Sequence, residues 1–209
     1  MTTEGHYVTY CQNSAANNHS GIAGRGRERG FTMVEVMIVT VIVAILVAVA
    51  APGFQDLIGN NRIVTEVYAL RASLNNARSE ALARRSPVVV CPSTDGAACA
   101  DSDDWSTGYI AFVDIDDDNT VDAGEDIIQI EGEERAVDIT FNNANRRVRF
   151  GAQGVALGFD GAFTFCDDRG AEDARALIVN PVGTARAATD TDSPEDDIVN
   201  VGGVNVTCN

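Results

Sequence analysis

The sequence contains no lysine, and its two histidines, His6 and His19, both lie within the first 30 residues. From residue 31 onward there is therefore no imidazole for general acid–base chemistry or for binding zinc. The G-x-S-x-G nucleophile elbow, the P-loop, the dinucleotide fingerprint and any C-x-x-C pair are also missing. These absences disfavour an enzyme and predict a structural protein that requires no cofactor.

Positive charge is scarce. The chain has 15 arginines and 31 acidic residues, and three Arg and two Glu fall within residues 1–30. Residues 31–209 therefore hold twelve Arg against 29 acids, a side-chain net charge of −17. Such a surface repels nucleic acid and anionic lipid headgroups over a Debye length. A salt-adapted or high-GC source explains this acidity better than a specific basic partner does.

A long apolar run occupies residues 31–51, and its only charged side chain is Glu35. Its 21 residues can span a bilayer core as a helix. A carboxylate inside such a run costs roughly 2.5–3.5 kcal/mol on insertion scales. Glu35 is therefore predicted to have a function, although a plain signal anchor with a stray glutamate remains the alternative.

The segment before the run is polar and basic. It carries Arg25, Arg27 and Arg29 and ends in Gly30. A basic flank keeps its side of the membrane cytoplasmic. No A-x-A-like cleavage site follows the run cleanly, which argues against an ordinary secretory signal.

The string Arg29-Gly30-Phe31-Thr32-Met33-Val34-Glu35 resembles the prepilin peptidase site of type IV pilins and type II secretion pseudopilins. The resemblance implies a leader of residues 1–30, cleavage between Gly30 and Phe31, and N-methylation of the new Phe31 amine. It implies an inner-membrane assembly platform and other pilins or pseudopilins as partners. Phe31 and Glu35 are four residues apart on one helix face. Glu35 of one subunit could therefore neutralise the amine of its neighbour and set the axial register.

Helical periodicity continues beyond the run to about Arg85, before Pro87. We expect one long helix with a transmembrane or filament-core half at 31–52 and an amphipathic half at 53–86. The resemblance places Pro52 where many pilins have a helix-kinking proline, which a missing backbone N–H explains. The apolar stripe predicted to face a sheet contains Phe54, Leu57, Ile58, Val64, Val67, Leu70, Leu74, Ala77 and Ala81.

Residues 87–209 show short apolar runs separated by Gly, Asn and Asp, which is typical of strands. The predicted fold is α+β, with the long helix packed on a mostly antiparallel sheet of a periplasmic domain. Residues 187–197 are predicted to form a mobile acidic loop. The predicted strands are 88–90, 109–113, 127–130, 136–141, 147–150, 162–166, 176–179 and 198–206.

Four cysteines lie outside the predicted leader: Cys91, Cys99, Cys166 and Cys208. An even number in an exported domain predicts two disulfides, and three pairings are possible. The short Pro/Ser/Gly-containing loop favours Cys91–Cys99, and Cys166–Cys208 would tie the C-terminus to a strand. Each disulfide would add ~2–4 kcal/mol.

Three groups of domain residues resemble the minor pseudopilin group that includes the H component of type II secretion and FimT of type IV pili. They are Leu74-x-x-Ala77-Arg78-Ser79-Glu80-Ala81, Val90-Cys91-Pro92-Ser93 with Cys99 and Trp105-x-x-Gly108-Tyr109, and Phe112-Val113-Asp114. The resemblance implies a single-pass bacterial inner-membrane protein that helps to initiate a type II secretion pseudopilus or a type IV pilus.

A pilus-associated DNA receptor is the second hypothesis. Some FimT proteins bind DNA through a G-R-x-R segment, and the corresponding residues are Gly183-Thr184-Ala185-Arg186, so only Arg186 carries over. Phosphate binding needs several cations acting together. Arg146, Arg147 and Arg149 form a second cluster, which alternation along a strand would divide between faces. Nucleic acid is therefore a disfavoured partner.

An acidic loop could bind calcium. Asp114, Asp116, Asp118, Thr120, Asp122 and Glu125 occupy positions 1, 3, 5, 7, 9 and 12 of an EF-hand-like spacing. Asn119 stands where glycine normally makes the sharp turn, and asparagine tolerates positive φ. The flanking strands depart from an EF-hand, and an acidic hairpin tip without a metal is the alternative.

Overall fold

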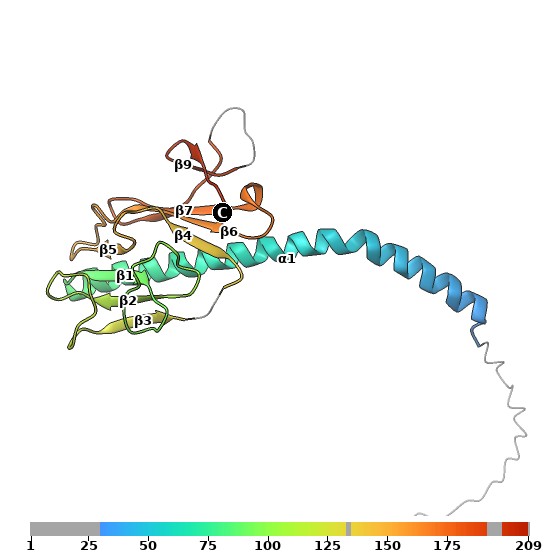
Figure 1. Ribbon diagram of the computed structural model, residues 1–209, viewed down its shortest axis with the longest axis horizontal. Helices are drawn as coiled ribbons and strands as arrows, with labels where there is room; N and C mark the ends of the chain where they lie inside the picture. Colours follow the sequence, from blue (N-terminus) through green and yellow to red (C-terminus); the bar gives the residue numbers. More distant parts are fainter. Residues whose placement is uncertain (1–29, 133–134, 192–197, 209) are drawn as a thin grey trace, which may run out of the picture. The chain divides into compact units, whose positions relative to one another are not determined.

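The computed structural model describes residues 30–132, 135–191 and 198–208 (Figure 1). The predicted leader lies outside the described residues except for Gly30. The chain divides into two compact units between Val47 and Ala48. Helix α1, Met33–Arg84, contributes to both units. The expected long helix is therefore present, and it continues through Pro52.

Local chemistry sets both ends of α1. At the start, Thr32 Oγ1 accepts a hydrogen bond of 3.2 Å from the backbone N–H of Glu35, which satisfies one free donor of the first turn. At the end, Arg85 adopts a left-handed conformation with φ 54°. Pro87, which has no backbone N–H, then begins the path into the first strand.

The strands after α1 form two four-stranded sheets and a small hairpin, and every pairing is antiparallel. The first sheet has the order β3–β2–β1–β5 and the second β4–β6–β7–β8, while β9 pairs with β10. The bounds are β1 Val88–Pro92, β2 Tyr109–Val113, β3 Ile127–Glu131, β4 Asp138–Phe141, β5 Val148–Phe150, β6 Gly161–Cys166, β7 Arg175–Val179, β8 Ala185–Ala187, β9 Asn200–Val201 and β10 Val204–Asn205.

The sequence suggested one sheet, whereas the structure has two. β5 pairs with the free edge of β1, and β4 pairs with β6 instead. The single strand expected at 198–206 is divided by Gly202 and Gly203, whose φ values of 63° and 81° suit a tight hairpin turn. Strand β8 and a 3₁₀ turn, Ala171–Asp173, were not expected, and residues 192–197 of the predicted acidic loop lie outside the described residues.

One core joins the second half of α1 to both sheets (Figure 1). Leu70 and Leu74 are buried there, as expected, together with Ala77 and Ala81. Trp105 lies at its centre, with its ring 4.8 Å from that of Phe163. The predicted stripe was wrong in its first half, because Ile63 is buried while Val64 is exposed. Phe54, Leu57 and Ile58 are also exposed.

Candidate functional site

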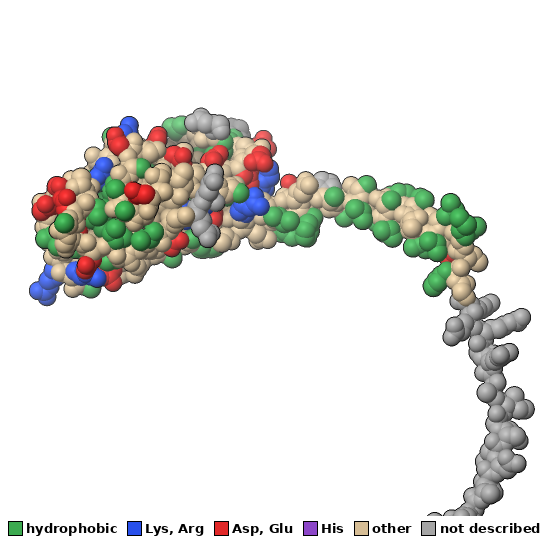
Figure 2. Space-filling model, turned by 60° about the horizontal axis from the view of Figure 1, so that its bottom comes forward, with side chains coloured by type: hydrophobic (Ala, Val, Ile, Leu, Met, Phe, Trp, Pro, Cys, Tyr) green, Lys and Arg blue, Asp and Glu red, His purple; other side chains and the backbone are tan. Residues whose placement is uncertain are grey.

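The first half of α1 presents an unpartnered apolar surface. Among the described residues, α1 is the one helix whose length and composition suit a membrane span. Its most apolar 18-residue window has a mean hydropathy of 2.9, and none of that window is buried. Figure 2 shows hydrophobic side chains along this part of the helix. The exposed apolar side chains include Phe31, Met33, Val34, Met37, Ile38, Val41, Ile42, Ile45, Leu46 and Val47.

Glu35 and the Gly30–Phe31 bond lie at the start of this apolar segment. Gly30 and Phe31 precede α1, and Phe31 is 82% exposed. Glu35 is in the first helical turn, where the positive end of the helix dipole favours a carboxylate. The structure therefore leaves the predicted cleavage position outside the helix and the predicted assembly residue exposed within it.

An arginine clamp attaches the middle of α1 to the turn between β6 and β7. The Arg169 guanidinium donates to both carboxylate oxygens of Asp167, to Asp56 O and to Asn60 Oδ1. Burial acts to raise the pKa of Asp167, but the hydrogen bonds and charge of Arg169 outweigh it and lower the pKa. The guanidinium lies against Gly59, where a side chain would obstruct it. This clamp was not predicted from the sequence, although a mid-helix glycine such as Gly59 can signal a close approach.

A second polar network fixes α1 to the first sheet. Ser73 Oγ lies 2.9 Å from the hydroxyl of Tyr109 and accepts a 2.7 Å hydrogen bond from Gln129. Burial raises the pKa of Tyr109, against the opposing effect of its Ser73 hydrogen bond. Arg135 donates to Glu66 at 2.7 Å, and its guanidinium lies over the Tyr109 ring. The helix is thus held in place by polar contacts as well as by the core.

The structure contains the two disulfides that the sequence favoured, Cys91–Cys99 and Cys166–Cys208. The first closes a turn in which Asp95 accepts hydrogen bonds from the backbone of Ala97 and Ala98. Those bonds lower the pKa of Asp95.

The second disulfide joins β6 to the C-terminal segment. That segment packs in a separate small cluster of Cys166, Ala174, Ala176, Ala188, Val199 and Val206. The C-terminal segment is therefore covalently attached at the edge of the main core.

The acidic loop between β2 and β3 brings three of its predicted ligands together. One carboxylate oxygen from each of Asp114, Asp116 and Asp118 lies within 4.8 Å of the others. Asp122 and Glu125 are not part of this group. The Glu125 carboxylate instead accepts the backbone N–H groups of Ile115, at 2.7 Å, and of Asp122, at 3.1 Å. Hydrogen bonds from Thr120 lower the pKa of Asp118.

The arginines considered for DNA binding are dispersed. Arg186 is exposed on β8 and is distant in sequence from Arg146, Arg147 and Arg149. Arg146 pairs with Asp101 at 2.7 Å, and Arg147 donates to Asn119 O. Arg149 binds two aspartates of the acidic loop. These four arginines therefore do not form a group of free cations that could contact adjacent phosphates.

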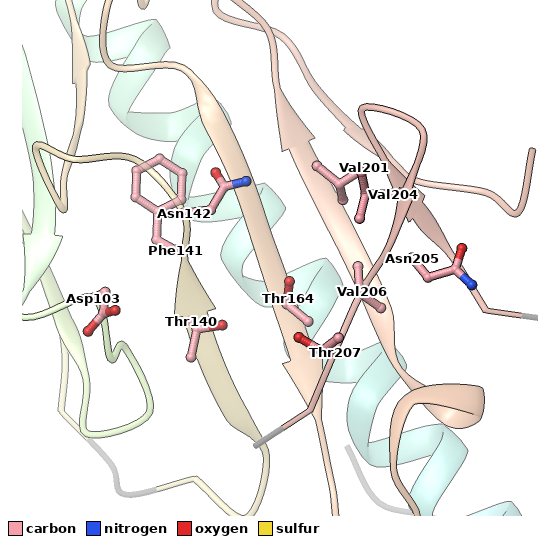
Figure 3. A pocket seen from close by; sticks show the side chains of 10 residues that line it. All are labelled: Asp103, Thr140, Phe141, Asn142, Thr164, Val201, Val204, Asn205, Val206 and Thr207. Carbon is pink, nitrogen blue, oxygen red and sulfur yellow. The ribbon is translucent and has the colours of Figure 1, made fainter.

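A shallow groove of about 360 Å³ separates the second sheet from the C-terminal segment (Figure 3). Its lining comes from β4, β6, the loop residues Asp103 and Asn142, and the segment from Val201 to Thr207. Its single ionisable side chain is Asp103. Hydroxyl, amide and valine side chains form most of the remaining wall. This composition provides no nucleophile–base pair of the kind that covalent catalysis requires.

Known proteins are similar to both parts of this chain, the apolar helix and the sheet domain that follows it in the sequence. A family model for the prokaryotic N-terminal methylation motif matches residues 25–51. Two curated fimbrial proteins of Pseudomonas aeruginosa are each 40% identical over 53 residues, covering 24% of this chain. The aligned region spans only 34% of the length of those relatives. The motif and the exposed apolar helix together indicate membrane anchoring.

Two crystal structures of the type IV minor pilin FimU from Pseudomonas aeruginosa are similar to this chain. They share 21% and 20% identity, with TM-scores of 0.47 and 0.44. The alignments cover 61% and 59% of this chain and 88% and 90% of those chains. The family model described as type II transport protein GspH matches residues 66–183, more than half of the sequence. The chain therefore belongs to this GspH family of pilin-like structural proteins, and it has the α+β pilin fold.

Proposed function

We propose that this protein is a minor pseudopilin or minor pilin that helps to initiate a type II secretion pseudopilus or a type IV pilus. Prepilin peptidase removes residues 1–30, and the Phe31 amine is methylated. The protein spans the inner membrane once, with its sheet domain in the periplasm. An inner-membrane assembly platform then brings its helix into contact with those of other subunits.

The observation that carries this proposal is the apolar first half of α1. The apolar side chains that the structure describes there are exposed in the isolated chain, and a methylation motif covers the same residues. Before assembly, lipid can cover this surface. In a filament, the helices of other subunits can replace the lipid. The sheet domain, held to α1 through Arg169 and Arg135, provides the surface that selects neighbours.

Glu35 sets the axial register between neighbouring subunits during assembly. A lone carboxylate is costly in hydrocarbon, and so is the cleaved amine at Phe31. Pairing Glu35 with the amine of an adjacent subunit removes both penalties in one axial arrangement. A subunit with an uncharged residue at this position would still insert in the membrane, but it would lose the preference for that arrangement.

The test compares Glu35→Ala with wild type in cells that carry the cognate filament system. Sheared filament fractions, membrane fractions and the mature N-terminus are measured in parallel. We expect Glu35→Ala to insert and be processed normally while its amount in the filament fraction falls at least tenfold. Asp168→Asn removes one exposed carboxylate from the sheet domain and is the matched control.

A plain membrane anchor gives a different pattern. If Glu35→Ala and wild type distribute identically between membrane and filament fractions, the carboxylate has no assembly role. A wild-type protein that is absent from every filament fraction would contradict the proposed function itself. The four arginines considered for DNA binding do not gather in one place, so we do not propose the DNA-receptor alternative.

A further inference from the structure

We propose that the loop between β2 and β3 binds one calcium ion through the carboxylates of Asp114, Asp116 and Asp118. This inference concerns the sheet domain, and it is independent of the role of the apolar helix. The three carboxylate oxygens already lie within 4.8 Å of one another. Calcium accepts six to eight oxygen ligands at 2.3–2.6 Å. Small side-chain shifts would therefore let a single ion contact all three oxygens, with the loop backbone in place.

The observation that points to a ligand is one buried oxygen of the Asp114 carboxylate that has no hydrogen-bond partner among the described residues. Its side chain is completely buried, and its Oδ2 atom accepts a 3.2 Å hydrogen bond from Arg149. Its Oδ1 atom is also buried, but no hydrogen-bond donor in the described structure reaches it. A buried carboxylate oxygen without a partner is strongly disfavoured, and nearly all such atoms have one. A cation at the cluster would supply the missing partner.

The charge around the cluster also needs a cation. Arg149 contacts both Asp114 and Asp117, so its single positive charge is shared. Within the described residues, Asp116 and Asp118 form no ion pair, although each lies close to the other carboxylates. Like charges at this separation repel one another, and a divalent ion would turn that repulsion into attraction.

The loop is held in shape from outside the cluster. Asn119 has φ 63°, so it makes the sharp turn at the sixth position that glycine makes in an EF-hand. Val121 packs against the buried cluster that contains Cys91 and Phe112. Glu125 holds the two sides of the loop together through backbone N–H groups. The ligands are therefore presented by a supported loop rather than by a free acidic chain.

The chemistry of the three carboxylate ligands favours calcium over zinc and magnesium. All three ligands are carboxylate oxygens, which suit a hard cation, and no histidine or free thiol is present in the sheet domain to favour zinc. Magnesium requires near-ideal octahedral geometry and loses its waters reluctantly, whereas calcium tolerates irregular sites. With Glu125 occupied elsewhere, we expect weak affinity, with a Kd of ~10⁻⁴–10⁻³ M, as in extracellular calcium modules.

The experiment titrates calcium chloride into the full chain in detergent micelles by isothermal titration calorimetry. Thermal unfolding is followed in parallel through the fluorescence of Trp105, the only tryptophan and a buried one. The test variant is Asp116→Asn/Asp118→Asn, because both side chains are exposed and their loss should not prevent folding. The control is Asp168→Asn/Glu172→Gln, which removes two exposed charges elsewhere.

We expect wild type and control to bind one calcium per chain. At a calcium concentration ten times the Kd, the ratio of folded to unfolded protein should rise about elevenfold. The Asp116→Asn/Asp118→Asn variant should lose at least nine-tenths of this affinity, and magnesium should have a much smaller effect. Equal calcium responses in the test and control variants would overturn the proposal. The absence of any calcium response in wild type would overturn it too, and would leave Arg149 as the one counterion of the cluster among the described residues.

Discussion

The two disulfides should differ in what they contribute to stability, because they close loops of very different length. Cys166 and Cys208 are 42 residues apart, whereas Cys91 and Cys99 are eight apart. In the chain-entropy relation, closing these loops stabilises the fold by about 4 and about 2.5 kcal/mol at 25 °C. Replacing each pair by alanine should therefore lower the free energy of unfolding by amounts that differ by about 1.5 kcal/mol.

Urea unfolding of the full chain in detergent micelles measures both values. Trp105 reports the sheet domain, since it is buried in the core formed by α1 and both sheets. Hydrogen exchange adds a local readout, because the longer disulfide holds the segment that contains β9 and β10. Residues 198–206 should lose protection when that disulfide is removed and should keep it when the shorter one is removed. An equal or larger loss from the shorter disulfide would refute the loop-length reasoning.

Three further substitutions test the attachment of α1 to the sheets. Leu74→Ala removes a fully buried side chain and should cost about 3–5 kcal/mol in urea unfolding, whereas Tyr68→Ala, on an exposed position of the same helix, should cost much less. Because its pKa is lowered, Asp167 stabilises the fold above its unfolded-state pKa of about 3.9 and loses this effect as the pH falls through its folded pKa. The melting temperature of wild type should therefore fall more steeply below about pH 4 than that of Asp167→Asn, and parallel profiles would contradict this. Gly59→Ala should not give the ~1 kcal/mol gain usual for a helix glycine, because the new Cβ would lie 2.8 Å from Arg169 Cζ; a clear rise in melting temperature would refute the clamp.

The helix was predictable from local features. Its apolar run and its stop before Pro87 both depend on residues close together in sequence. Three disulfide pairings were possible from the sequence, and the structure has the one that the short Cys91–Cys99 loop favoured. These predictions needed no knowledge of how distant segments pack.

The features that the sequence did not reveal depend on long-range packing. Ile63 and Val64 are adjacent and both apolar, so periodicity could not determine which one faces the core. The division into two sheets depends on β5 pairing with β1, a choice between several short strands of similar composition. Arg169 contacts Asn60, which is more than a hundred residues away in the sequence, and no local motif predicts such a pair.

The acidic loop was predictable from the sequence only in part. The spacing predicted its carboxylates, and the structure gathers Asp114, Asp116 and Asp118. The sequence could not show that Glu125 would hold the loop backbone, or that Arg149 would approach from another strand. Both depend on the way in which β2, β3 and β5 come together in three dimensions.

The measurement that tests the central claim most directly is the mass of the mature N-terminal peptide from native membranes. The account predicts a peptide that begins at Phe31 and carries one N-methyl group. A chain that still begins at Met1, or that has been cut near Ala51, would contradict prepilin processing and the filament role built on it.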